Sequence, residues 1–112
     1  MAAKFELRKT ANGQFLFNLK ASNGEIILTS ETYKDKSAAT GGIESVRKNA
    51  VIAERFERKT NTSNQPYFVL KASNGQTIGK SESYSSNAAM ENGIASVMKH
   101  APLATISDMT LL

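Results

Sequence analysis

The chain contains no cysteine and no tryptophan, and it has only two prolines in 112 residues. Without cysteine, no disulfide can staple the fold and no thiolate can act as a nucleophile or metal ligand. Small secreted domains often need disulfides, so we expect a cytoplasmic location. The N-terminus lacks the apolar core of a signal peptide, and no apolar run approaches the roughly 20 residues of a membrane helix. We therefore expect a soluble protein with no membrane partner.

A block of charge of one sign is also missing. Fourteen Lys and Arg residues and ten Asp and Glu residues give a net charge of +4, but the two signs alternate along the chain. Such alternation is typical of a solvated mixed surface and not of a polybasic strip.

A repeat is the strongest pattern that is present. When the chain is shifted by 51 positions, Lys20–Gly24 (KASNG) falls on Lys71–Gly75 without a gap. Repeats of this kind reveal architecture before any propensity does. One unit of about 50 residues is close to the lower size limit for a stable core. We therefore expect a single domain, residues 1–112, made of two internal repeats (about 4–53 and 54–109) that share one core.

Each repeat predicts three strands followed by a helix. Residues 15–21 alternate apolar and polar side chains with period two, which indicates a half-buried strand. Asn23-Gly24 after it predicts a hairpin with a type I′ turn. Asp35 and Ser86 are good N-cap residues and predict the starts of the two helices. With a final segment at 104–109, the order is β-β-β-α-β-β-β-α-β. This order predicts an α+β fold, with an antiparallel sheet shared by the repeats, two helices and a short C-terminal strand.

Differences and similarities between the repeats predict two further details. The third strand of the second repeat, residues 76–81, is less apolar than its counterpart at 25–30, so we expect it nearer an edge of the sheet. Each helix also carries a glycine near its middle, Gly42 and Gly93. A glycine in that place costs roughly 1 kcal/mol relative to alanine. We expect it to allow a close approach between the helix backbone and a strand.

Several short motifs together resemble one family. Lys20–Gly24 is followed by Ser30–Tyr33 (SETY) and Gly42–Val46 (GIESV), and the second repeat carries SESY at Ser81–Tyr84 and ENGIASV at Glu91–Val97. This combination resembles the YegP-like family of small bacterial proteins without an assigned activity. The resemblance covers nearly the whole chain and implies the tandem-duplicated form, in which the two copies pair within one chain. It carries no catalytic, cofactor or ligand residues to transfer.

The doubled Ser-Glu-Thr/Ser-Tyr motif supplies the best candidate binding residues. Glu31 with Tyr33, and Glu82 with Tyr84, would form two sites related by a pseudo-twofold axis. A carboxylate beside a phenol could bind a polar or cationic ligand. The alternative is structural: the tyrosines cover the edge of the core with wet hydroxyls, and the glutamates favour the positive end of the helix that follows. The residue types favour the structural alternative, because each meets a local need.

A basic face of the sheet is the second candidate. Lys20 and Lys71 occupy equivalent positions on the strand face opposite the core. Further cations could line the same side: Arg8, Lys9, Arg55, Arg58 and Lys59. Basic residues beside aromatics on an open sheet hold single-stranded nucleic acid in several modules. Here the phenylalanines have core parity, and exposed strand lysines also deter aggregation without any ligand. Nucleic acid is therefore the less favoured kind of partner.

The sequence shows no catalytic or metal-binding constellation. His100 is the only histidine, and no cysteine or paired carboxylate motif accompanies it, so we expect no metal site. No phosphate-binding loop, nucleophile elbow or zinc-binding histidine pair is present, so we expect no cofactor. We predict a monomeric binding or interaction module of unknown partner. A weak nucleic-acid binder is the alternative, and an enzyme is the remaining class.

Overall fold

The computed structural model describes residues 3–111, and it has the predicted order of elements. The strands are β1 (Lys4–Lys9), β2 (Phe15–Lys20), β3 (Ile26–Thr29), β4 (Phe56–Thr60), β5 (Pro66–Lys71), β6 (Thr77–Lys80) and β7 (Thr105–Asp108). The helices are α1 (Lys36–Asn49) and α2 (Asn87–His100), with single 3-10 turns η1 (Ala53–Arg55), η2 (Ala101–Leu103) and η3 (Met109–Leu111). The tail residues 110 and 111 thus belong to η3, whereas residue 112 lies outside the described residues. The α+β class is confirmed.

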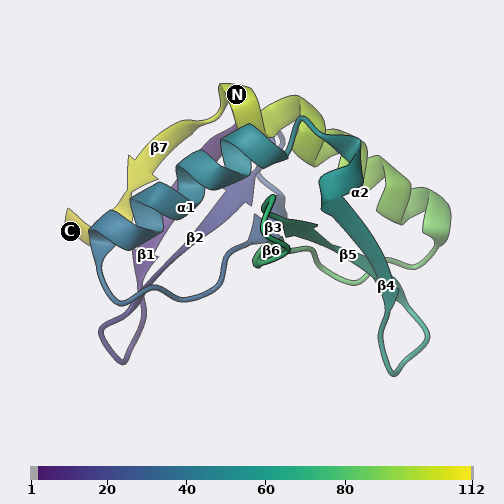
Figure 1. The fold of residues 1–112 in the computed structure, drawn as a ribbon, viewed down its shortest axis with the longest axis horizontal. Helices are drawn as coiled ribbons and strands as arrows, with labels where there is room; N and C mark the ends of the chain where they lie inside the picture. The colour runs from purple at the N-terminus through teal and green to yellow at the C-terminus, as the bar shows by residue number, and fades with distance from the viewer. Residues whose placement is uncertain (1–2, 112) are drawn as a thin grey trace.

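All strands join one seven-stranded sheet in the order β4-β5-β6-β3-β2-β1-β7. The strands within and between the repeats are antiparallel, and only the added strand β7 runs parallel to its neighbour, β1. Figure 1 shows the two helices arching over the sheet, with β7 beside β1 at one end and β4 at the other. Within residues 3–111, no helix combines the length and the apolar character that crossing a membrane requires.

The prediction that β6 lies nearer an edge is wrong, because β6 pairs with β3 at the centre of the sheet. Thr29 of β3 stands opposite Lys80 of β6 and joins the two repeats. The low apolar content of β6 has a packing explanation. A Cβ atom on Gly79 would lie only 2.6 Å from a methyl carbon of Leu28, so the Leu28 side chain fills the space above that glycine.

The hairpins bend at the predicted places with a different turn. Gly24 and Gly75 have φ of 87° and 85°, but neither preceding asparagine has a positive φ, so the type I′ prediction is wrong. Instead, Asn23 Oδ1 accepts a hydrogen bond from the Glu25 N–H (3.0 Å), and the register shifts between β2 and β3. One glycine in the left-handed region therefore closes each longer loop.

The helix starts are confirmed by their caps. The Asp35 carboxylate accepts from the Ala38 N–H (2.7 Å), and the Ser86 hydroxyl accepts from the Ala89 N–H (3.1 Å). Each cap satisfies one of the N–H groups that a helix start leaves without an intrahelical partner.

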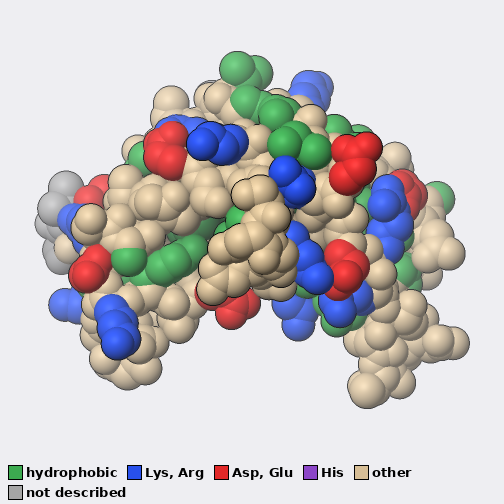
Figure 2. All heavy atoms as spheres, in the orientation of Figure 1, with side chains coloured by type: hydrophobic (Ala, Val, Ile, Leu, Met, Phe, Trp, Pro, Cys, Tyr) green, Lys and Arg blue, Asp and Glu red, His purple; other side chains and the backbone are tan. Residues whose placement is uncertain are grey.

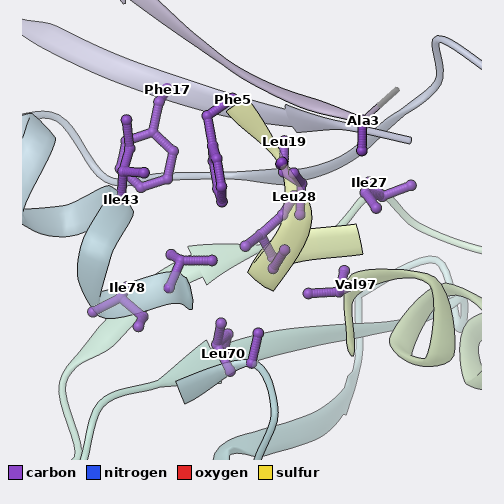
Figure 3. Close-up of a cluster of buried hydrophobic side chains, with 14 of the residues drawn as sticks. Ala3, Phe5, Phe17, Leu19, Ile27, Leu28, Ile43, Leu70, Ile78 and Val97 are labelled. Carbon is purple, nitrogen blue, oxygen red and sulfur yellow. The ribbon is translucent and has the colours of Figure 1, made fainter. Parts of the chain in front are cut away.

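One cluster of buried side chains spans both repeats. In Figure 3, Phe17, Leu19 and Leu28 from the first repeat point into the same interior as Leu70 and Val97 from the second. Each helix also packs on a strand of the other repeat, α1 on β6 and α2 on β3. Folding of one repeat therefore leaves apolar surface that only the other repeat covers.

The close approach at the helix glycines is confirmed, although its main partner is a tyrosine. A Cβ atom on Gly42 would lie 2.7 Å from the Tyr33 Cζ atom and 3.1 Å from a ring carbon of Phe17 of β2. A Cβ atom on Gly93 would meet the Tyr84 ring at the same 2.7 Å. The tyrosine in the segment before each helix is thus the main neighbour that leaves room only for glycine, and the strand is a lesser one.

Candidate functional site

The open face of the sheet, opposite the helices, places Lys20 in an ion cluster around Glu6. The Glu6 carboxylate is 4% exposed and lies 3.2 Å from Lys20 Nζ, 2.5 Å from Arg8 Nη2 and 3.4 Å from Lys4 Nζ. Burial raises the pKa of Glu6, but the hydrogen bonds and charges of Lys20 and Arg8 outweigh it, so the net pKa is lowered. Lys20 is therefore already paired within the protein.

Lys71 takes part in the equivalent cluster of the second repeat, around Glu57. The Glu57 carboxylate lies 3.0 Å from Lys59 Nζ and 3.1 Å from Lys71 Nζ. Hydrogen bonds from Lys59 and Lys71 hold the pKa of Glu57 below its usual value. Lys20 and Lys71 thus lie in separate clusters, and each is compensated by its own carboxylate.

The predicted row of cations on this face is divided, because successive strand residues point to opposite faces. Arg58 lies on the helix side, where its Nη2 donates to Glu91 Oε1 of α2 (2.8 Å). Lys9 lies over the Phe15 ring with its Nζ 5.9 Å from the ring centre, and Arg55 belongs to η1. Figure 2 shows positive and negative side chains interspersed on the face it presents.

Tyr33 and Tyr84 are half-buried and pack in the same way. The Tyr33 ring stacks on Phe17 with centroids 6.3 Å apart and planes at 11°, and the Tyr84 ring stacks on Phe68 at 6.3 Å and 12°. Each tyrosine also covers the glycine of the helix that follows. The rings therefore close the edge of the core, and their outer atoms remain available to solvent.

The glutamates of the motif act on these phenols through their charge. Burial raises the pKa of Tyr33, and the negative charge of Glu31 raises it further. The pKa of Tyr84 is raised by burial, then by Glu82 and then by Glu25. Both phenols consequently stay protonated over the physiological range, as hydrogen-bond donors and not as nucleophiles.

One of the two motifs borders an open depression of about 670 Å³ where the repeats meet. We call it the groove. The lining residues are Glu31, Thr32, Tyr33, Lys59, Tyr67, Val69, Gln76, Thr77 and Lys80. The groove therefore joins Glu31 and Tyr33 to the open face of the second repeat. The structure does not bring Glu82 and Tyr84 to this groove.

Lys80 and Tyr67 give the groove its chemical character. The Lys80 ammonium lies 5.1 Å from the centre of the Tyr67 ring, within the range of a cation–π contact. Among residues 3–111, no carboxylate forms an ion pair with Lys80, whereas Lys59 in the same groove is paired with Glu57. Lys80 thus contributes an uncompensated positive charge beside a flat ring.

Sequence reasoning missed Lys80, although a comparison of the repeats contains the signal. The position equivalent to Lys80 holds Thr29, and the position equivalent to Tyr67 holds Leu16. Positions at which the two repeats carry different residues are easy to identify, because most of the framework is shared. These two differences fall within one depression, and only the fold shows that they do.

Among residues 3–111, no group of three or more His, Cys, Asp and Glu side chains gathers as a metal site would require. His100 lies in the last turn of α2, with its Nδ1 2.9 Å from the Ser96 carbonyl oxygen. The groove offers two lysines, of which Lys59 is already paired with Glu57, together with hydroxyls, an amide and one carboxylate.

The pattern of one sequence family, described as "Domain of unknown function (DUF1508)", matches the chain twice, at residues 11–57 and 61–108. Each match begins ahead of the second strand of a repeat and ends in the strand that follows its helix. The matched unit is thus β-β-α-β, with β4 closing the first match and β7 the second.

Whole-length relatives are similar over nearly all of both chains. The UPF0339 protein YegP of Yersinia pestis is 58% identical over 107 residues, 96% of each chain. A UPF0339 protein of Pseudomonas aeruginosa is 56% identical over 108 residues, 96% of this chain and 98% of that protein. The solution structure of a UPF0339 protein from Shewanella oneidensis has a TM-score of 0.91 at 51% identity, covering 97% of this chain and 92% of that one. The solution structure of the Escherichia coli protein of unknown function yegP also has a TM-score of 0.91, at 49% identity, with 97% and 94% covered.

Proposed function

We propose that this chain, which belongs to the DUF1508 family and is a YegP-like protein without an assigned activity, is a binding module. Its ligand would lie in the groove. The observation that carries the proposal is the unpaired Lys80 ammonium beside the Tyr67 ring. The relatives bear no enzymatic name, and we assign no catalytic residue.

The ligand class follows from the groove's side chains. Lys80 offers a charge that an anionic group would neutralise, and Tyr67 offers a flat surface for a planar or apolar part. Gln76 and Thr77 add polar groups near them, and Glu31 bears a negative charge on the opposite repeat. An anion with a polar or flat body, small enough for about 670 Å³, fits this arrangement.

The pseudo-equivalent surface of the first repeat supports one site per chain. It has Thr29 in place of Lys80 and Leu16 in place of Tyr67. It also has Glu25 in place of Gln76, and Glu25 is close enough to Tyr84 to raise that tyrosine's pKa. An anion would therefore meet a negative charge there instead of a positive one.

A titration of isotope-labelled protein with defined small anions tests the proposal. The set would contain inorganic phosphate, a dicarboxylate, an aromatic carboxylate and a nucleoside monophosphate, with amide shifts as the readout. We expect saturable shifts around the groove with at least one of them. Lys80→Thr, which copies Thr29, should weaken that binding roughly tenfold or more. The control Lys99→Thr removes an exposed lysine of α2 that does not line the groove, and it should leave the groove's affinity unchanged. Shifts that persist in Lys80→Thr would contradict the proposal.

Short single-stranded nucleic acid is a second candidate, favoured by the flat Tyr67 ring next to a free ammonium. The other open-face lysines are held by Glu6 and Glu57, so only one or two phosphates would be contacted. The salt dependence should then be shallow, with a log–log slope of roughly −0.7 per phosphate. A fluorescent oligonucleotide whose binding is lost in Tyr67→Leu would support this candidate. No binding at low salt would remove it.

The proposal keeps the protein as a cytoplasmic monomer. The antiparallel pairing of β3 with β6 lets the two repeats satisfy each other within one chain, which supports a monomer. Sedimentation at increasing concentration tests this part, and a mass that doubles with concentration would contradict it.

A further inference from the structure

The two ends of the pseudo-symmetric sheet are treated differently. The outer edge of β1 is covered by β7, in the register Phe5 opposite Ile106 and Leu7 opposite Asp108. Among residues 3–111, no strand lies beyond the outer edge of β4, the equivalent of β1. Figure 1 shows this contrast at the two ends of the arch.

Side chains from α1 hold β7 in place. Lys36 Nζ donates to the Asp108 carboxylate (2.8 Å), and Arg47 Nη2 donates to the Ala104 carbonyl oxygen (2.6 Å). Under this cover Leu7 is 2% exposed. The first repeat thus shows what a strand in this position looks like and which groups retain it.

The second repeat has an unfilled space at the equivalent place. An open depression of about 320 Å³ lies between β4 and α2. Its lining residues are Arg58, Lys59, Thr60, Asn87, Met90 and Glu91. Arg58 is the counterpart of Leu7, and Asn87 is the counterpart of Lys36. The depression therefore corresponds to the place that Asp108 occupies in the first repeat.

The backbone on the covered edge shows which groups a parallel strand uses. The Ala3 carbonyl oxygen accepts from the Thr105 N–H of β7 (3.4 Å). Because backbone groups alternate sides along a strand, Phe5 and Leu7 also turn theirs toward β7.

The same alternation of backbone groups leaves N–H donors and C=O acceptors without a strand partner on the outer edge of β4. The Asn61 N–H bonds the Gln65 carbonyl across the β4–β5 hairpin (2.9 Å), so residues of that parity face β5. Arg58 and Thr60 have the opposite parity and turn their backbone groups to the outer edge, where both residues are exposed. The edge thus offers an unpaired ladder to an incoming strand.

We propose that β4 and α2 form a docking site for an extended acidic segment of a partner protein, which adds as a strand parallel to β4. Backbone hydrogen bonds to Arg58 and Thr60 would supply affinity, as in other cases of strand addition. This site lies at the end of the sheet and shares only Lys59 with the lining of the groove.

The chemistry of the partner segment follows from the β7 precedent. A carboxylate at the Asp108-equivalent place would meet the Asn87 amide and the Nη1 group of Arg58, whose Nε and Nη2 groups already bond Glu91. Two residues earlier in the partner segment, the position equivalent to Ile106 would lie beside Phe56. Met98 replaces Arg47 in this repeat, so an apolar side chain suits that position. The expected signature is an aliphatic residue followed two positions later by Asp or Glu.

Charge also selects against a second copy of this chain. An edge-to-edge pair of β4 strands would bring Arg58 and Lys59 of two chains together, and like charges across a strand pair are destabilising. Because Glu91 and Glu57 already pair with these two cations, the acidic character of the segment follows from the β7 precedent.

A displayed library of random ten-residue peptides, selected on the intact protein, tests the proposal. We expect enrichment of the aliphatic-x-acidic signature and slower amide exchange at Arg58 when a synthetic copy of a selected peptide binds. Thr60→Pro removes one outward N–H and keeps the Arg58 side chain, so it should abolish binding. Arg58→Pro is the second edge variant, in case Thr60→Pro disturbs the hairpin. The groove variant Lys80→Thr should bind the peptide normally.

A gain-of-function variant sharpens the test. Asn87→Lys restores the cation that Lys36 supplies in α1, and it should tighten binding of the selected acidic peptide by roughly two- to five-fold. Absence of any enriched peptide, or equal binding to wild type and to a folded edge variant, would overturn the proposal. A concentration-dependent dimer that an edge variant abolishes would overturn the partner assignment in favour of self-association.

Discussion

Glu6 and Glu57 occupy equivalent positions in the two repeats, but their surroundings differ. Glu6 is buried and forms ion pairs with three cations in the half of the sheet that β7 completes, whereas Glu57 is half-exposed and forms ion pairs with two lysines. One position along, Leu7 is a core residue and Arg58 is a surface residue. The repeats therefore share a framework, and the extra strand on one of them decides which equivalent residues are core.

The largest effect should come from separating the repeats. Cutting the chain between Ala53 and Glu54 would leave each fragment with apolar surface that the other fragment normally covers. We expect neither fragment alone to unfold cooperatively, and the mixed fragments to regain a melting transition. Circular dichroism melts measure this. Sharp transitions from both lone, monomeric fragments would contradict the shared core.

Exchanging the residues at the covered and uncovered edges should change the unfolding free energy by very different amounts. Leu7→Arg places a cation in a buried position, where the cross-strand neighbour Asp108 already pairs with Lys36, and it should cost roughly 3 kcal/mol or more of unfolding free energy. Arg58→Leu, at the exposed edge, should change it by less than about 1 kcal/mol. Urea denaturation of both variants makes the comparison. Equal losses would mean that β7 does not create the difference.

The helix glycines should respond alike, because both face a tyrosine ring. Gly93→Ala gains helix propensity but pushes a Cβ atom against Tyr84, so we expect a net loss of roughly 1–3 kcal/mol. Gly42→Ala should behave in the same way against Tyr33. Adding Tyr84→Phe to Gly93→Ala should recover part of the loss, because the hydroxyl is the nearest atom. A higher melting temperature for Gly93→Ala would refute the packing argument.

The ion pair that retains β7 should make the covered edge of the first repeat sensitive to acid. Hydrogen bonds from Lys36 and then Thr110 lower the pKa of Asp108 from its ordinary value of 3.8 to about 2. A lowered folded pKa contributes stability above 3.8, and this contribution is lost as the pH falls toward about 2. Lys36→Asn, which copies Asn87, should flatten stability across that window. An unchanged pH profile would show that the pair does not retain β7.

The smallest effect concerns the two tyrosines. Burial and Glu31 together raise the pKa of Tyr33, so removing the charge with Glu31→Gln should lower that pKa while Tyr84 titrates as before. The phenolate absorbance, compared with a Tyr84→Phe background, follows Tyr33 and Tyr67 only. No change in Glu31→Gln would show that burial alone sets the Tyr33 pKa.

Local signals in the sequence predicted much of the fold. Asp35 and Ser86 cap the helices as expected, because the bond from a cap side chain depends only on residues three positions away. Period two in β2 identified Phe17 and Leu19 as core residues for a similarly local reason. The prediction of a type I′ turn was wrong, because the Asn-Gly pair is also compatible with a longer loop that has a single left-handed glycine.

The candidate site was only half predictable. Glu31 and Tyr33 were identified as candidates from the doubled motif, and the structure places them at the groove. Lys80 and Tyr67 come from another repeat and reach the groove only through the pairing of β3 with β6. Lys20 and Lys71 looked free in the sequence, because the carboxylates that pair with them lie on neighbouring strands.

The duplication, the order of strands and helices, the caps and the apolar faces can all be inferred from the amino-acid order alone. These features depend on neighbours along the chain and on a spacing that can be counted. Three outcomes became visible only in the folded protein: β6 is central, β7 covers β1, and no strand among residues 3–111 covers the outer edge of β4. Those outcomes depend on where a pseudo-twofold arrangement puts strand ends that are 50 or more residues apart, and no local rule encodes that placement.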